Sequence, residues 1–315
     1  MTTTIEAATT PKKPARPQSG PGSRADGWTR RFPLLPALVF TFVITQLPFI
    51  VTIFYSLQSW NLVRPGSRHF VGLDNYIEVF SDSQFRRVTL NTIVLTVGAV
   101  LIAVALGLLL ALMLNRAFPG RAVVRTLLIT PFLITPVAAA LLWKTTLLDP
   151  TYGLVNFVLA PLGVGQTDWI SSFPLLAVMM AIVWQWTPFM MLLILAGLQS
   201  QPTDVLEAAG VDGASNFGIF REITIPHLRR FIELGVVLGT IYLINTFDTI
   251  YMMTQGGPGI ASSNLPFYIY QRAFLGFDIG QSAAMGVVVA ILTTIVSIFA
   301  LRLIFRTFSG NEASA

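Results

Sequence analysis

The sequence predicts an all-α integral membrane protein with six transmembrane helices. Hydrophobic residues make up 54% of the 315-residue chain and charged residues only 11%, a balance typical of membrane proteins. Six apolar runs are each long enough to cross a bilayer as a helix. They cover about 32–57, 89–114, 123–148, 174–198, 231–254 and 279–304. An even number of spans places both termini on the same side of the membrane.

The two ends of the chain are predicted to be tails outside the membrane. Residues 1–31 are rich in Thr, Pro and Gly and basic, which indicates a disordered tail. The first apolar run is too long for the core of a signal peptide and no small-residue cleavage site follows it. We therefore expect region 32–88 to be a retained first helix with an external loop, and 307–315 to be a second short tail.

The distribution of basic residues predicts the orientation. The N-terminal tail holds six Lys and Arg, loops 115–125 and 199–230 hold three each, and the C-terminal end holds two. The opposite side holds the other six of the 20. Because cytoplasmic loops carry the excess of Lys and Arg, both termini and the 199–230 loop are expected in the cytoplasm. Loops 59–88 and 255–278 are expected outside.

Two features concern packing within the spans. Small residues recur at every fourth position of the second span, at Ala99, Ala103, Gly107 and Ala111, which predicts close approach of another helix. Pro131 and Pro136 in the third span are expected to kink or break that helix.

Segment 202–226 is the longest polar interruption in the second half of the chain. It is expected to form two short amphipathic helices joined by a turn at Gly210 and Gly213, the second helix capped by Asp212 or Ser215. Pro226 is expected to end the second helix. Such a pair forms a firm element on the membrane surface. It suits either docking of another protein or packing against its own bundle.

Polar and aromatic residues gather on two spans. In the fourth span the residues that cluster around Pro188 are Trp184, Gln185, Trp186 and Phe189. In the fifth span the polar face holds Gly239, Tyr242, either Asn245 or Thr246, and Thr249, with Asp248 adjacent. Aromatic, amide and hydroxyl groups together suit a sugar, which needs a ring to stack on and hydrogen-bonding partners. The alternative is that both clusters only pack helices together.

The sequence also disfavours several function classes. The chain has no cysteine, no lysine after a Gly-rich phosphate-binding loop, and neither the G-x-S-x-G nor the H-E-x-x-H pattern. A membrane-embedded enzyme and a self-powered pump are therefore disfavoured. An ion-coupled carrier is disfavoured because the predicted spans hold few carboxylates, chiefly Glu233 and Asp248.

Segment 202–226 resembles the EAA loop of the membrane subunits of ATP-binding-cassette (ABC) importers. Its match consists of Glu207-Ala208-Ala209, Gly213, Ile223 and Ile225-Pro226, with Ile225 the single departure from a usual leucine. The triplet Asp212-Gly213-Ala214 is typical of the carbohydrate-importing branch. The resemblance implies a type I ABC importer permease fold with cytoplasmic coupling helices. The residues it implies for ATPase docking are Glu207, Ala208, Ala209, Asp212, Gly213, Ala214, Phe217 and Phe220.

The resemblance extends over about 32–306, with a five-helix core at 89–306. Gly72-Leu73-Asp74-Asn75-Tyr76 and Thr254-Gln255-Gly256-Gly257-Pro258 resemble segments of the first permease of maltose, glycerol-phosphate and trehalose importers. The resemblance implies a substrate path through Gln185, Trp186, Phe189, Gly239, Tyr242, Leu243, Asn245 and Thr246. Leu243 and Thr246 stand where the maltose relative has asparagines, so the same sugar contacts are not implied.

The resemblance also implies the partners and the location. These are a second, related permease subunit, a dimer of ABC ATPase subunits, an extracytoplasmic sugar-binding protein and membrane lipid, but no nucleic acid. The chain itself is expected to bind no cofactor, since ATP and Mg belong to the ATPase subunits. It is expected in a bacterial cytoplasmic (inner) membrane. The sugar expected is a disaccharide such as trehalose or maltose, or glycerol-phosphate.

Overall fold

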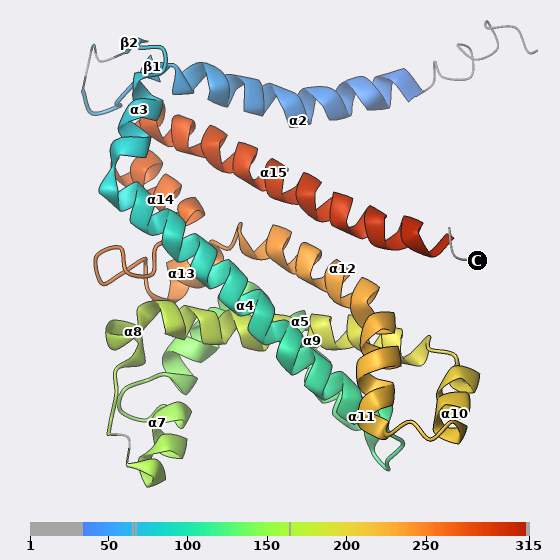
Figure 1. The fold of residues 1–315 in the computed structure, drawn as a ribbon. Helices are drawn as coiled ribbons and strands as arrows, with labels where there is room; N and C mark the ends of the chain where they lie inside the picture. The colour runs from blue at the N-terminus through green and yellow to red at the C-terminus, as the bar shows by residue number, and fades with distance from the viewer. Residues whose placement is uncertain (1–33, 65, 67, 164, 313–315) are drawn as a thin grey trace, which may run out of the picture. The chain divides into compact units, whose positions relative to one another are not determined.

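The computed structural model describes residues 34–64, 66, 68–163 and 165–312 (Figure 1). The predicted tail 1–31 lies outside the described residues, as does the end of the predicted C-terminal tail. The chain divides into two compact units, 1–51 and 52–315. Helix α2 (Leu35–Ser56) supplies the described part of the first unit, and its most apolar stretch is 0% buried.

Four helices of the described residues are long and apolar enough to cross a membrane, and they match four predicted spans. They are α2, α4 (Ser83–Asn115), α9 (Pro174–Gln199) and the Ile279–Phe299 part of α15 (Ile279–Glu312). A bent pair of helices, Arg121–Leu133 and Pro136–Leu147, passes the same test together and counts as a fifth. The chain is therefore a mostly helical membrane protein with four to five candidate spans.

The predicted break in the third span is confirmed. Helix α5 (Arg121–Leu133) and helix α6 (Pro136–Leu142) meet at a bend of 102°, and a π-helical turn, η2 (Trp143–Leu147), continues α6. Thr135 is extended, with ψ 144°, because the residue before a proline is pushed out of the helical region. Pro136 then opens α6, where its missing N–H is harmless.

The fifth predicted span, 231–254, is not one continuous helix. Helix α12 (Ile225–Leu243) ends at Leu243, and the short α13 (Asp248–Met253) begins after four residues. The backbone N–H groups of Asn245 and Thr246 form tight turn bonds to Tyr242 and Leu243. The side chain of Asn264 donates to the Thr246 carbonyl, so a distant loop occupies the backbone that a helix would use.

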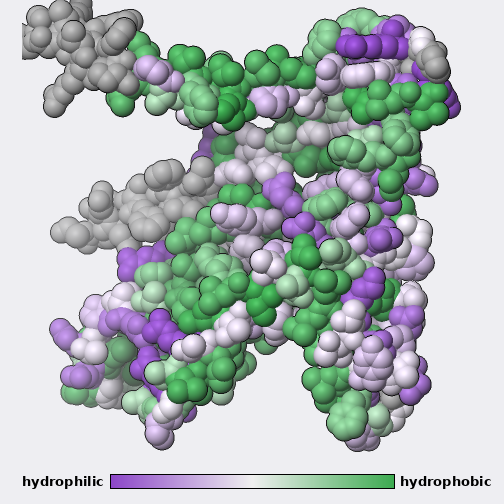
Figure 2. Space-filling view, turned by 180° about the vertical axis from the view of Figure 1, so that it is seen from behind, coloured by the Kyte–Doolittle hydropathy of each residue, from purple (hydrophilic) through white to green (hydrophobic). Residues whose placement is uncertain are grey.

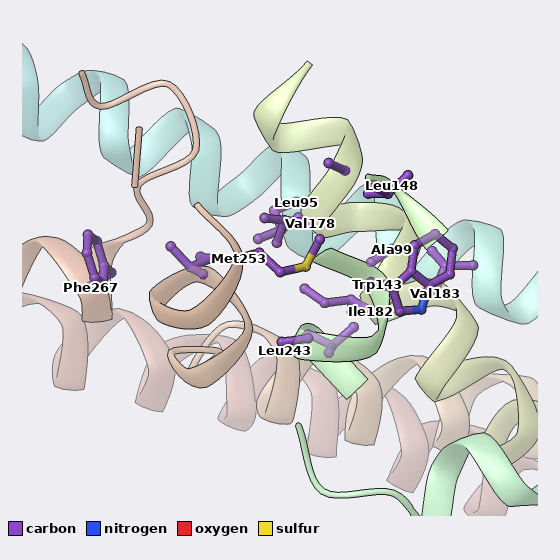
Figure 3. Packing of buried hydrophobic residues seen from close by; sticks show 14 of the residues in the cluster. Leu95, Ala99, Trp143, Leu148, Val178, Ile182, Val183, Leu243, Met253 and Phe267 are labelled. Atoms are coloured by element: carbon purple, nitrogen blue, oxygen red, sulfur yellow. The ribbon is translucent and has the colours of Figure 1, made fainter. Parts of the chain in front are cut away.

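The predicted close packing of the second span is confirmed in the core. Ala99, Ala103 and Ala111 of α4 are fully buried, and α4 packs along α9. A Cβ added at Gly107 would lie 2.7 Å from the Met190 Cβ. Figure 3 shows the adjoining core, in which Leu95 and Ala99 meet residues of α9, α12 and α13. The labelled α9, α12 and α13 residues there are Val178, Ile182, Val183, Leu243 and Met253.

Short elements connect the long helices. They are β1 (Gln58–Ser59) paired antiparallel with β2 (His69–Phe70), α3 (Asp74–Ser81), α7 (Leu154–Leu159), the 3₁₀ turn η3 (Ala160–Leu162), α8 (Trp169–Ser172), α14 (Leu265–Tyr270) and the π-helical turn η5 (Gln271–Leu275).

A polar network links α14 and η5 to Asp82, the residue that caps the start of α4. Arg272 Nη2 and Tyr268 Oη both donate to Asp82 Oδ2, at 3.1 and 2.9 Å. Burial raises the pKa of the Tyr268 hydroxyl above its usual range.

Candidate functional site

The segment 202–226, called the docking loop from here on, folds as the predicted pair of helices joined by a glycine turn. Helix α10 (Thr203–Val211) leads through Gly213, whose φ of +82° is left-handed, to α11 (Asn216–Ile219). Ser215 caps α11, because its Oγ accepts the Gly218 N–H at 3.1 Å. The N–H of Ala214 donates to the Ala209 carbonyl at 3.0 Å, which closes α10.

The docking loop differs from expectation at Gly210 and at Pro226, and Gly210 lies within α10 instead of in the turn. Nothing lies within 4 Å of a Cβ built on Gly213, so a side chain there is disfavoured by the backbone φ and not by a clash. Pro226 does not end the second helix. A π-helical turn, η4 (Phe220–Thr224), precedes α12, and the Ile225 N–H donates to the Phe220 carbonyl five residues back. This wider turn admits Pro226 near the start of α12.

The docking loop presents an apolar surface bordered by charge. The side chains of Val211 and Phe217 are 88% and 71% exposed, whereas Phe220 is half-buried. The exposed docking residues that the sequence singled out are Glu207, Ala208, Asp212, Gly213, Ala214 and Phe217, with Ala209 half-buried. Figure 2 shows hydrophilic residues gathered around this end of the molecule, next to the hydrophobic surface of the long helices. Exposed apolar side chains such as these two suit contact with a protein partner.

Both ends of the docking loop are anchored to the helices. The His227 Nε2 lies 3.1 Å from Ser200 Oγ and 3.2 Å from the Gly197 carbonyl, which links the start of α12 to the end of α9. A Cβ at Gly197 would lie 2.6 Å from the Phe231 ring, so the two helices are in close contact there. The docking loop is therefore held at a point where α9 and α12 are packed together.

A cavity of about 460 Å³ lies where the broken third span meets α9 and α12. It is called the aromatic pocket below and is lined by Phe132, Ile134, Pro136, Gln185, Trp186, Phe189, Leu238 and Tyr242. The Phe132 and Phe189 rings stack at 5.5 Å, and Trp186 lies 5.7 Å from each of them. Trp186 and Tyr242 are 5.5 Å apart between ring centroids. Helices from three parts of the chain thus bring four aromatic rings around one cavity.

The helix break supplies the polar partner of this pocket. Gln185 Nε2 donates to the Ile134 carbonyl at 2.8 Å, a group that the bend at Pro136 frees from regular helix bonding. The Gln185 side chain is buried, while the Tyr242 side chain is 62% exposed. The pocket therefore combines ring faces with an amide and a phenol hydroxyl, which can stack on and hydrogen-bond a sugar.

The structure gathers half of the predicted substrate-path residues in the aromatic pocket. Gln185, Trp186, Phe189 and Tyr242 line it, and their contacts with substrate stay a prediction. The other four lie elsewhere. Gly239 packs under Met190, Leu243 is buried in the core, Asn245 lines another cavity, and the Thr246 carbonyl accepts from Asn264. Sequence reasoning missed Phe132, Ile134, Pro136 and Leu238, although the paired prolines marked the bend that brings the first three here.

Within the described ranges, no group of three or more His, Cys, Asp or Glu side chains could hold a metal ion. The aromatic pocket contains no acid or base side chain among its lining residues. The arrangement is thus suited to binding a neutral ligand.

Comparison with known proteins gives consistent matches over most of the chain. Residues 103–309 match the family model described as "Binding-protein-dependent transport system inner membrane component". A trehalose/maltose transport system permease protein of Thermococcus litoralis is 37% identical, over 82% of this chain and 88% of that protein. A sulfoquinovosyl glycerol transport system permease protein of Agrobacterium fabrum is 36% identical, over 86% and 88%.

The fold also matches solved structures. A chain of a bacterial ABC transporter involved in the import of alginate superposes with a TM-score of 0.75 at 24% sequence identity. The match covers 90% of this chain and 96% of that chain.

Proposed function

Because the chain belongs to the family of binding-protein-dependent transport system inner membrane components, we propose that it forms half of the translocation path of an ATP-driven sugar importer. It is a multi-pass permease of the inner membrane and is not itself catalytic. The aromatic pocket carries the proposal, because ring faces beside a buried amide suit a carbohydrate. Its volume of about 460 Å³ lies within the range of small-molecule sites.

The proposed fold is that of a six-span type I importer permease. A six-span fold needs one span in addition to the five candidates described above. This span would be formed by α12 and α13 together, with an interruption at 244–247. Interrupted helices at a binding site are tolerated in a membrane where they line a cavity. Both termini and the docking loop would lie in the cytoplasm, as the distribution of basic residues predicts.

The docking loop is proposed to couple this subunit to an ATPase. Its exposed Val211 and Phe217 would enter a groove of an ATPase subunit, with Glu207 making charge-assisted hydrogen bonds. ATP and Mg would bind only there. Because one chain supplies one docking loop and ABC ATPases close as a dimer, a second, related permease would supply the other. An extracytoplasmic binding protein would deliver the sugar.

The class of sugar follows from the relatives. Relatives named for trehalose, maltose and sulfoquinovosyl glycerol transport favour a disaccharide or a glycoside of comparable size. Glycerol-phosphate is less favoured, since no basic residue lines the aromatic pocket. The choice among the neutral sugars is left to experiment.

The test is uptake by the reconstituted complex in proteoliposomes, with ATP inside and trehalose, maltose, sulfoquinovosyl glycerol or glycerol-phosphate outside. We expect ATP-dependent uptake of one of the first three that needs the binding protein. Addition of an ionophore, which removes the ion gradient, distinguishes an ATP-driven importer from an ion-coupled carrier. Uptake that continues without ATP and stops with the ionophore would refute the proposal.

A further inference from the structure

A second cavity is lined in part by a residue just beyond the C-terminal end of α12, the helix that also contributes to the aromatic pocket. It has a volume of about 520 Å³ and lies between Asn245 and the α15 helix. Tyr242 of the aromatic pocket lies three positions before Asn245, and the Asn245 N–H donates to the Tyr242 carbonyl at 3.2 Å. The end of α12 therefore contributes to both cavities within a single turn.

The α15 side of this cavity carries three hydroxyl groups. Thr293, Thr294 and Ser297 line the cavity together with Gly286, Val289, Ala290 and Ile298. Other positions of the helix are exposed and apolar, such as Ile291 (51%) and Ile295 (58%). Helix α15 thus has one hydroxyl-bearing face toward the cavity and an apolar face of the kind that meets lipid.

The Thr293 hydroxyl also points to a ligand in this cavity. Among the described residues its Oγ1 is buried and has no hydrogen-bond partner, and the Thr293 side chain is part of the cavity lining. The neighbouring Thr294 Oγ1 donates to the Ala290 carbonyl at 2.7 Å, the usual solution for a threonine in a helix. The large majority of buried hydroxyl groups in native proteins have partners, so a partner for this group would come from outside the described residues.

We infer that this cavity is a second carbohydrate subsite, which binds sugar hydroxyls while the aromatic pocket stacks on a sugar ring. The inference rests on the proposed function and adds α15 to the substrate path. Asn245 and the hydroxyls of α15 offer donors and acceptors without charge, which matches a neutral polyhydroxylated ligand. The three-residue separation of Tyr242 in the aromatic pocket and Asn245 in this cavity favours this ligand over a helix of the second permease subunit.

Two substitutions test the subsite, each with a matched control. Thr293→Val keeps the side-chain shape and removes the hydroxyl. Its control is Thr126→Val in α5, where the hydroxyl donates to the Ala122 carbonyl at 3.0 Å and lies outside both cavities. Ala290→Phe fills the cavity, and Ile291→Phe places the same ring on the exposed face of α15.

The readout is uptake of radiolabelled trehalose by the full complex in proteoliposomes, with maltose and sulfoquinovosyl glycerol measured in parallel. We expect Thr293→Val to raise the KM of uptake by about 3- to 10-fold, the effect of losing one hydrogen bond. Ala290→Phe should reduce uptake at least 10-fold. Both control variants should match the wild type, and all four should co-purify with the second permease and the ATPase.

The possible outcomes separate the two proposals. If the wild type takes up none of the three sugars, the proposed function and this inference both fail. If it does, and Thr293→Val and Ala290→Phe transport like their controls, only the subsite is refuted. If either variant instead loses the second permease on co-purification, with an unchanged KM in the complexes that assemble, the cavity is a contact between subunits and the inference is overturned.

Discussion

Substitution of Gly213 should weaken ATPase docking by an amount set by its backbone conformation. The φ of +82° lies in the left-handed region, which costs a residue with a Cβ about 1–2 kcal/mol. Because no atom lies within 4 Å of an added Cβ, steric contact contributes nothing further for alanine. A penalty of about 1–2 kcal/mol reduces the population of the native turn about 5- to 30-fold relative to its alternatives.

The three variants for this test are Gly213→Ala, Gly213→Asn and Gly210→Ala. Asparagine tolerates the left-handed region, so Gly213→Asn should weaken docking less than Gly213→Ala. Gly210 lies within α10 and also has open space around it, so Gly210→Ala should leave docking unchanged or favour the helix by about 0.5–1 kcal/mol. It is the matched control.

The assay is the affinity of the purified permease pair for the ATPase subunit, measured alongside sugar uptake. We expect the order of affinities to be Gly210→Ala at or above wild type, then Gly213→Asn, then Gly213→Ala. Equal affinity and uptake for Gly210→Ala and Gly213→Ala would refute the reasoning, because the two substitutions add the same atom and differ only in backbone φ.

Three further predictions concern other parts of the molecule. The chain has no cysteine of its own, so single introduced cysteines report the topology. Tyr152→Cys (71% exposed) should react with an impermeant thiol reagent in intact cells, whereas Val211→Cys (88% exposed) should react only after permeabilisation. The opposite pattern would reverse the topology. Trp186→Ala and Tyr242→Ala should each reduce sugar uptake about 10-fold or more without loss of assembly, and wild-type uptake in both would leave these rings with a packing role. The Ser171 hydroxyl and backbone N–H lower the pKa of Asp168 below its usual 3.8, so the α8 cap is stabilising above about pH 3.8 and is lost as the pH falls through the lowered pKa. The protection of the α8 amides from hydrogen exchange, relative to an unstructured chain at the same pH, should therefore fall at acid pH, and protection that does not change with pH would contradict this.

The local elements of the docking loop could be predicted because their causes are local. A glycine at the turn and a serine at the cap specify the geometry through their own backbone and side chain. The bend of the third span was equally predictable, since a proline acts on the residue before it. Gln185, Trp186 and Phe189 were predicted from their clustering around Pro188, and Tyr242 from the helical spacing of the polar face of the fifth span.

The features that sequence reasoning missed depend on contacts between distant segments. The interruption after Leu243 involves the Asn264 side chain, which reaches the Thr246 carbonyl from a loop 18 residues away. Phe132 enters the aromatic pocket only because the third span turns by 102°. The cavity on α15 was missed because threonines are ordinary in a membrane helix, and the sequence does not show that Thr293 Oγ1 lacks a partner among the residues that the structure describes.

The π-helical turn between the docking loop and α12 has a consequence for changes in chain length. A π turn holds one more residue than the α-helical turn it replaces, so deleting one residue between Phe220 and Thr224 should restore a regular helix while both flanking helices keep their facing. Deletion within the regular part of α12 should instead rotate everything beyond it by about 100°. The restored helix, however, would set a carbonyl against the ring of Pro226. A deletion in η4 should therefore be tolerated only together with replacement of that proline, which makes the two positions interdependent under selection.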